Sequence, residues 1–194
     1  MTAQDMRSES LRGGFADPAR QSARAFRAAL DALSRPGHIT RIEGAAPPAP
    51  LSAAAGGLLL VLADATTPIW LAPSHDVPAV RDWITFHTGA PFATAGGAQF
   101  AVGTWAALLP VDRFAVGLPD YPDRSATLIV EMTALHPEGA RLTGPGILGT
   151  AHLDLPEIAA FRANHALFPL GFDTFLTTGS EIAGLPRSTR IEAT

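Results

Sequence analysis

The sequence predicts a single α/β domain built on a mixed, mostly parallel sheet with helices on both faces. Helical and extended patterns alternate along the chain, which is typical of this class. The run Ser125–Met132 is apolar enough for a central strand that is covered on both sides. Hydrophobic residues make up 47% of the 194 positions, so one full core can be filled.

The first structured element is expected to be a helix. Residues 1–13 are polar and are predicted to form a disordered tail, which leaves 14–194 as the domain. Asp17 suits the N-cap and Pro18 the first helical position. Ser34–Gly37 ends the helix. Apolar residues recur along it at spacings of 4, 3, 4 and 3, and these predict its buried face: Ala19, Ala23, Phe26, Leu30 and Leu33.

Strands and helices then follow one another. The alternating or apolar extended segments predict strands at residues 38–43, 67–71, 99–102 and 125–132. The helical patterns predict helices at residues 52–63, 77–87 and 156–165. The second of these should end at Gly89, and the first is apolar on every side, which is typical of a buried helix. Residues 44–50 form an Ala/Pro linker, and residues 106–111 are apolar without a clear period.

The last part of the chain combines turns with short extended pieces. A turn-rich loop over 117–124 leads into the central strand. Residues 140–143 and 149–153 bracket a Gly-Pro segment and predict a hairpin. Phe172–Thr177 reads as a strand that Gly179 turns, and residues 185–191 close the chain. This arrangement should place Arg187 and Arg190 beside a buried strand.

Composition excludes several kinds of chemistry. The chain has no cysteine, which excludes disulfides, thiol catalysis and thiolate metal sites. All 14 basic residues are arginine, so neither an internal Schiff base nor a phosphate-loop lysine is possible. A net charge of −4 gives no indication of nucleic acid or anionic membrane as a partner. Only 16% of residues are charged, which favours a surface partly covered by another chain.

The location is expected to be cytoplasmic. The N-terminus lacks the apolar core of a signal peptide. The longest apolar run, Leu51–Ala63, is shorter than the roughly 18 residues that a membrane helix needs.

Two motifs do not support a site. Gly144–Gly149 matches G-x-G-x-x-G, but extended residues and Pro156 follow it where a dinucleotide site requires a helix, so a hairpin loop is favoured. The six histidines show no metal-ligand spacing, and His152 with Asp154 alone is insufficient. No metal, no cofactor and no catalytic residue is therefore assigned.

Several residues remain candidates for a ligand or interface site. Arg24 and Arg27, with Arg20, form a stripe that is either a solvated face or a dock for an acidic partner. His87 ends an apolar helix face and is either a packed or capping histidine or a general base.

The loop entering the central strand gives a second set. Tyr121, Asp123 and Arg124 form either an ion-paired turn or an anion-binding or interface loop; its place at the amino end of a strand counts against a ligand site. Four arginines suit bidentate phosphate contacts: Arg35, Arg124, Arg187 and Arg190.

Three blocks together carry a family resemblance. They are residues 14–37, residues 121–127, and residues 168–175 with the ending Leu-Pro-Arg-Ser-Thr-Arg at 185–190. As a set they resemble the PhnH family of phosphonate-metabolism proteins, which belong to the carbon–phosphorus lyase core complex. The likeness runs from about residue 13 to residue 192.

The resemblance implies a fold like the large domain of the pyridoxal-phosphate-dependent aminotransferases with the cofactor site lost, and the absence of lysine agrees with this. It also implies a non-catalytic subunit that joins companion subunits G, I and J and is a homodimer when isolated. That complex supports formation of ribose 1-phosphonate 5-triphosphate from ATP and a phosphonate. Two alternatives stay open: a nucleotide-phosphate-binding protein that uses arginine-lined loops, and a self-contained homodimer that binds a small molecule.

Overall fold

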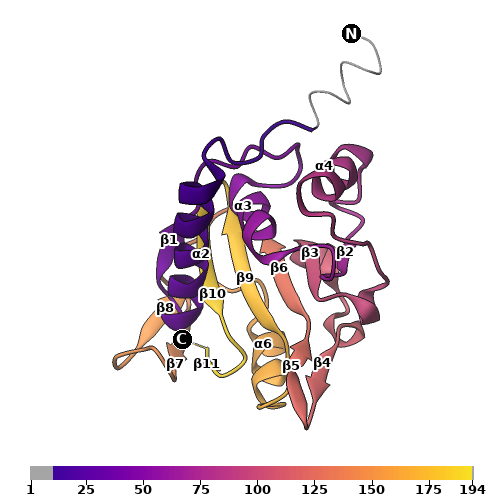
Figure 1. Cartoon of the computed structure of the whole chain (residues 1–194). Helices are drawn as coiled ribbons and strands as arrows, with labels where there is room; N and C mark the ends of the chain where they lie inside the picture. Colours follow the sequence, from indigo (N-terminus) through magenta and orange to yellow (C-terminus); the bar gives the residue numbers. More distant parts are fainter. Residues whose placement is uncertain (1–10, 194) are drawn as a thin grey trace.

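The computed structural model describes residues 11–193 as an α/β fold (Figure 1). The helices are α2 (Pro18–Ser34), α3 (Ala53–Leu62), α4 (Pro78–Thr88), α5 (Trp105–Leu108) and α6 (Ile158–His165), with 3₁₀ turns η1 (Ala95–Gly97) and η2 (Val111–Arg113). The strands are β1 (Ile39–Arg41), β2 (Ile69–Leu71), β3 (Phe100–Thr104), β4 (Val116–Leu118), β5 (Tyr121–Ser125), β6 (Thr127–Glu131), β7 (Ala140–Thr143), β8 (Ala151–Leu153), β9 (Asp173–Thr178), β10 (Glu181–Leu185) and β11 (Arg190–Glu192).

The main sheet has six strands in the order β1-β10-β9-β6-β3-β2. Strands β2, β3, β6 and β9 run parallel, whereas β10 and β1 pair antiparallel. The two small sheets, β11-β7-β8 and β4-β5, are antiparallel as well. The prediction of a mostly parallel sheet is therefore wrong. Gly179, with φ of +53°, and Ser180 return the chain directly after β9, so β10 must lie antiparallel to it.

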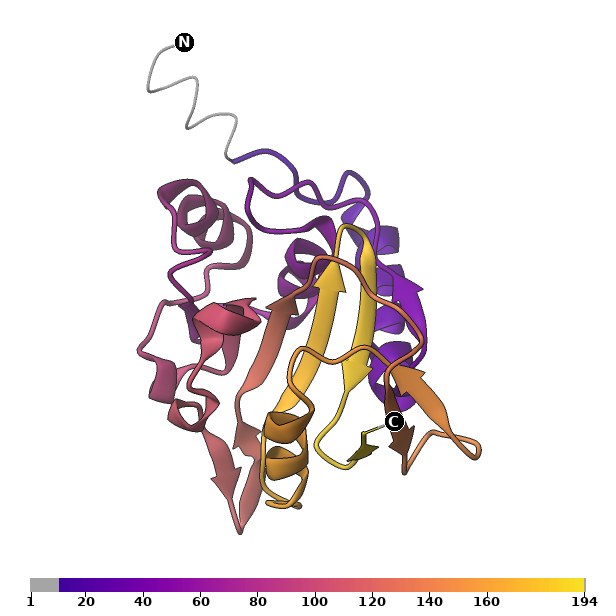
Figure 2. The same cartoon turned by 180° about the vertical axis from the view of Figure 1, so that it is seen from behind.

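Each face of the main sheet has its own cover. Helices α2, α3 and α4 lie over one face, and α5, α6 and the sheet β11-β7-β8 lie over the other (Figures 1 and 2). The prediction of helices on both faces is confirmed. Strand β6 lies between them as predicted: Ile129 contacts the first cover, Leu128 and Val130 contact the second, and all three are fully buried.

Helix α2 begins and ends as predicted, but its predicted buried face is wrong. Asp17 caps it, accepting a hydrogen bond from Arg20 N. The residues packed on the sheet are Ala25, Ala29 and Ala32. Four residues of the predicted face point outward instead, and we call them the outer stripe: Ala19, Ala23, Phe26 and Leu30.

The close approach of α2 to β10 explains this reversal. A Cβ atom added to Gly184 of β10 would lie 2.5 Å from the carbonyl carbon and oxygen of Ala32. The helix backbone therefore lies almost against the strand backbone, and only small side chains fit between them. Alanines occupy that face, and the bulkier Phe26 and Leu30 remain 44% and 54% exposed.

Helix α3 is buried on nearly every side, as predicted. Ser52 caps it by accepting a hydrogen bond from Ala55 N at 3.1 Å. Its two glycines allow close neighbours, because a Cβ on Gly57 would lie 2.2 Å from Ile42 Cγ2 and one on Gly56 would lie 2.6 Å from Pro47 Cγ.

Two segments differ from the sequence interpretation. The expected loop over 117–124 is mostly the hairpin β4–β5, which projects at the lower end of the molecule in Figure 1. The apolar segment 106–111 belongs largely to the short helix α5 and the turn η2. The predicted hairpin at 140–153 is present: Gly144, Gly146 and Gly149 have positive φ in its loop, and strand β8 follows the glycine motif where a dinucleotide site would have a helix.

The predicted disordered tail, residues 1–13, lies outside the described residues for its first ten positions. Its end is attached to the domain: Trp83 Nε1 donates to the Arg12 carbonyl at 2.9 Å, and Ala46 N donates to the Gly13 carbonyl at 2.8 Å. Between residues 11 and 193, no helix combines the length and the apolar character that crossing a bilayer requires.

Candidate functional site

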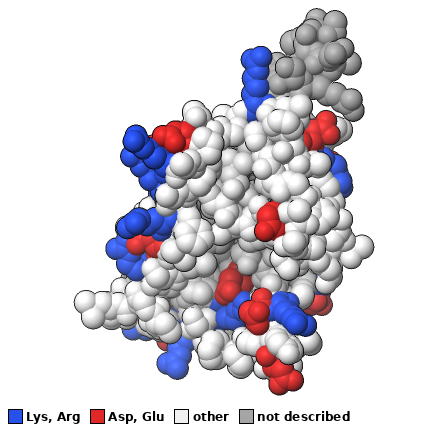
Figure 3. All heavy atoms as spheres, viewed as in Figure 1, with Lys and Arg blue, Asp and Glu red and all other residues white. Residues whose placement is uncertain are grey.

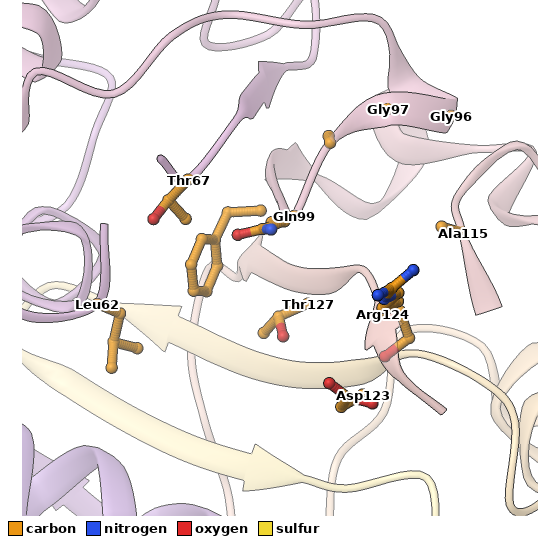
Figure 4. A pocket seen from close by; sticks show the side chains of 12 residues that line it. Leu62, Thr67, Gly96, Gly97, Gln99, Ala115, Asp123, Arg124 and Thr127 are labelled. Carbon is orange, nitrogen blue, oxygen red and sulfur yellow. The ribbon is translucent and has the colours of Figure 1, made fainter. Parts of the chain in front are cut away.

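Two neighbouring hollows lie at the amino ends of the parallel strands. The larger has a volume of about 700 Å³ and lies among Thr67, Gln99, Arg124 and the backbone of Gly96 and Gly97 (Figure 4). The second, about 540 Å³, lies beside Phe168, Pro186 and Arg187. The two hollows share the side of β5 and the start of β6, at Asp123, Ser125 and Thr127.

Strand β5 supplies the exposed charges of the larger hollow. The guanidinium carbon of Arg124 lies 4.1 Å from the centroid of the Tyr121 ring, so the ring holds this side chain in place. Arg124 forms no ion pair with any other described residue. Asp123, one position earlier, lines the same hollow (Figure 4). The wall therefore offers one cation and one carboxylate, an arrangement suited to a ligand with both an anionic group and hydroxyl or amino groups.

The guanidinium group of Arg187 already has hydrogen-bond partners within the protein. Its Nε donates to Asp173 Oδ1 at 3.1 Å, its Nη2 to Asp173 Oδ2 at 2.6 Å, and its Nη1 to the Pro122 carbonyl at 2.7 Å. Its Nη2 also contacts Ser125 Oγ, and only 13% of its side chain is exposed. This network joins the start of β9 to β5. Arg187 can bind a phosphate only by giving up the bidentate pair with Asp173.

The structure thus brings together four of the residues selected from the sequence: Tyr121, Asp123, Arg124 and Arg187. The others lie elsewhere. Arg24 and Arg27 are on the solvent side of α2, and Arg35 at its end pairs with Asp31. Arg190 lies in β11 of the small sheet.

His87 lies on α4, away from both hollows. Its ring packs at centroid distances of 4.8 Å from Trp83 and 4.9 Å from Phe86. A Cβ on Gly14 would come within 2.6 Å of the His87 ring, so the start of the described chain closes over it. The buried Nε2 finds no hydrogen-bond partner among the described residues.

The opposite ends of the same strands carry a polar cluster that sequence reasoning missed. Glu131 ends β6, and its Oε1 accepts from Ser52 N at 2.7 Å while Thr177 Oγ1 donates to its Oε2 at 3.0 Å. His75 Nε2 lies 3.9 Å from Glu131 Oε1, and His75 Nδ1 lies 2.9 Å from Ser74 Oγ. A signal was available, because polar residues directly after buried parallel strands gather at one edge of a sheet.

Burial shifts the pKa values of two groups in this cluster. It raises the pKa of the Glu131 carboxyl, against the lowering effect of the hydrogen bonds from Ser52 and Thr177. It lowers the pKa of the His75 imidazole, which is 2% exposed. Both shifts act against the charged forms of the two side chains.

The cluster of Ser74, His75 and Glu131 differs in geometry from a catalytic triad. In a serine hydrolase the serine contacts one imidazole nitrogen and the carboxylate accepts from the other. Here Ser74 lies against Nδ1, but the 3.9 Å between His75 Nε2 and Glu131 is too long for a hydrogen bond. Within residues 11–193 there is also no group of three or more His, Asp or Glu side chains placed to hold a metal ion.

The fold and the hollows together define an α/β protein with a mixed sheet and an arginine-bearing surface at the amino ends of its strands. The family model described as "Bacterial phosphonate metabolism protein (PhnH)" matches residues 13–192. The chain therefore belongs to the PhnH family, as the three sequence blocks indicated.

Two curated proteins are similar along most of their length. One is the alpha-D-ribose 1-methylphosphonate 5-triphosphate synthase subunit PhnH of Rhizobium meliloti (strain 1021), 42% identical over 203 aligned positions that cover 99% of each chain. The other is the putative C-P lyase subunit protein HtxG of Stutzerimonas stutzeri, 28% identical over 177 positions that cover 86% of this chain and 84% of that protein.

Proposed function

We propose that this chain is a subunit of a carbon–phosphorus lyase core complex in phosphonate catabolism. The observation that carries the proposal is the 42% identity, over nearly the whole of both chains, to an alpha-D-ribose 1-methylphosphonate 5-triphosphate synthase subunit. In the complex a phosphonate would displace adenine from ATP, which gives ribose 1-phosphonate 5-triphosphate and free adenine, with this chain as a non-catalytic member beside subunits G, I and J. Because the Arg187 guanidinium is already paired with Asp173, the loop around β5 has a structural role.

Affinity capture tests this proposal. The tagged full-length chain would be recovered from its host grown on a phosphonate as sole phosphorus source, and the recovered proteins identified by mass spectrometry. We expect the companion subunits in fixed ratio. Recovery of the tagged chain without companions would overturn the proposal, and so would turnover of ATP and a phosphonate by the purified chain alone.

Finer features belong to the same proposal. The fold would correspond to the large domain of the aminotransferases with the cofactor site lost. Without lysine the chain has no side-chain amine for an internal aldimine, so pyridoxal phosphate should produce no absorption from a lysine aldimine. The isolated chain would be a cytoplasmic homodimer, which sedimentation at micromolar concentration and cell fractionation would check.

A second candidate is nucleotide-phosphate binding at the larger hollow, in a homodimeric protein. The unpaired Arg124, stacked on Tyr121 and facing a space of about 700 Å³, favours it. Calorimetric titration with ATP and with a ribose phosphonate would detect such binding, and Arg124→Gln should abolish it. A flat titration with the unaltered chain would remove this candidate.

A further inference from the structure

The outer stripe of α2 is an apolar surface that the described chain leaves uncovered. Its members recur at spacings of 4, 3 and 4, which places them along one side of the helix for about 17 Å. Phe26 and Leu30, its two large members, are 44% and 54% exposed. Isolated apolar residues at a surface are ordinary, but a continuous helical stripe is typical of a helix that packs against something.

The same helix already has a separate face on the sheet. Ala25, Ala29 and Ala32 are at most 3% exposed, so these alanines form the face that packs α2 on the sheet. Helix α2 is therefore apolar on two sides, and one of them has no partner among the described residues.

Arginines border the stripe and are not neutralised. Arg20 lies beside Asp17 with Nε and Oδ2 3.7 Å apart, and Arg35 pairs with Asp31. Arg24 and Arg27 have no ion pair within the described residues. Figure 3 shows basic side chains gathered on the flank of the molecule that α2 occupies in Figure 1. A surface that combines exposed apolar side chains with unpaired arginines has the composition of an interface core and its rim.

A hollow of about 360 Å³ adjoins Arg24 on the side of α2 that faces Arg41 and Glu43, away from the outer stripe. Arg41 lies on its far side, and Gln21 and Glu43 complete its walls. Arg41 donates to Ser180 Oγ at 3.0 Å, so its charge is held there without a carboxylate partner. Glu43 already supplies a carboxylate to this hollow, so an acidic group of another chain would meet a like charge there as well as the two guanidinium groups.

We infer that the outer stripe of α2 is a docking surface for an acidic helix of a companion subunit. This inference rests on the function proposed above, since it supplies the place where this chain joins its complex. The apolar ridge of Ala23, Phe26 and Leu30 fits the groove between ridges of a second helix. Arg24 and Arg27 lie on the same side of the stripe, so carboxylates along one flank of the partner helix would neutralise them.

Charge argues against a second copy of this chain as the occupant. The two acidic residues of this segment, Asp17 and Asp31, are engaged with Arg20 and Arg35. A copy of α2 therefore brings no free carboxylate to Arg24 and Arg27. An antiparallel pairing about a two-fold axis would also place each arginine-bearing flank against its own copy, where like charges repel.

The test compares surface variants of the full chain in the capture experiment. Phe26→Ser with Leu30→Ser removes the stripe, and Phe86→Ser with Leu109→Ser removes equally exposed apolar groups from α4 and the end of α5. We expect the first pair to lose roughly tenfold or more of the captured companion subunits, whereas the control pair retains them. Thermal unfolding would first establish that all variants are folded.

Variants that remove arginine charges provide a second test in the same capture experiment. Arg24→Gln with Arg27→Gln should weaken capture and reduce its dependence on salt, whereas Arg162→Gln, on exposed α6, should leave both unchanged.

The outcomes separate the two proposals. If the unaltered chain captures companions and the stripe variants capture them equally well, the inference is wrong while the proposed function stands. If the unaltered chain captures none, the proposed function itself fails. If the stripe variants retain companions but convert a dimer into a monomer in sedimentation, the occupant is a second copy and the inference is overturned.

Discussion

Helices α2 and α3 lie side by side over the same face of the sheet, yet they relate to it in opposite ways. Helix α3 is apolar all round and almost completely buried. Helix α2 is apolar on two separate sides, and only the side made of alanines is fully buried. The comparison shows that an apolar pattern identifies residues able to pack, while the distance to the neighbouring backbone decides which of them do.

The largest loss of stability is expected when a side-chain atom is added at the close contact between α2 and β10. In Gly184→Ala the new Cβ meets the Ala32 backbone at 2.5 Å, and backbone cannot move aside as a side chain can. We expect the free energy of unfolding to fall by about 3 kcal/mol, at the upper end for overpacking. Chemical denaturation would measure it.

Gly96→Ala is the matched control for that substitution. Its nearest neighbour would lie 3.6 Å away, an ordinary contact, so its stability should stay within about 0.5 kcal/mol of the unaltered chain. Equal stability of the Gly184 and Gly96 variants would show that α2 is not held close to the sheet.

A smaller loss should follow from the same change in α3. In Gly57→Ala the new Cβ approaches Ile42 Cγ2 to 2.2 Å, and Ile42 is buried and branched at Cβ, so it has little room to turn. Part of this cost is offset because alanine favours a helix more than glycine does. We expect a net loss of about 1–2 kcal/mol in the denaturation assay. A gain in stability would mean that α3 packs less tightly than described.

The hydrogen bond between Glu131 and the start of α3 should make the stability of the folded protein depend on pH. Glu131 accepts from Ser52 N at the N-cap of α3, and burial raises its pKa in the folded protein. An acid whose pKa is raised on folding gives full stability below its unfolded pKa and loses stability as the pH rises toward the folded value.

The variant Glu131→Gln keeps the shape without the charge. Its stability relative to the unaltered chain should therefore be greater at pH 7.5 than at pH 4.5, which unfolding at the two pH values would measure. A difference independent of pH would contradict the raised pKa of Glu131.

The smallest effect on stability is expected at the outer stripe. Phe26→Ser or Leu30→Ser removes apolar area that is about half exposed and lies away from the sheet, so each should change the free energy of unfolding by about 0.5 kcal/mol or less. A loss of several kcal/mol in the isolated chain would show that the stripe is packed within the protein itself, and the distinction between the two sides of α2 would disappear.

The candidate site was only partly predictable. Tyr121, Asp123 and Arg124 are adjacent in sequence, so the charged loop could be selected without knowing the fold. The pairing of Arg187 with Asp173 across 14 positions, and the approach of His75 to Glu131 across 56 (131 − 75), depend on which strands become neighbours in the sheet. Sequence periodicity carries no information about that order.

By itself the sequence determined the local elements and the family. Asp17 and Pro18 mark the start of α2, Gly89 with φ of +68° ends α4, and the apolar run of β6 marks the central strand. These features depend on a few neighbouring residues, so they can be read locally. Only the tertiary structure decided that alanines rather than Phe26 and Leu30 face the sheet, and that Glu131 is buried. Each of these depends on how closely two segments distant in the sequence approach one another, and it is the packing of the whole chain that sets that distance.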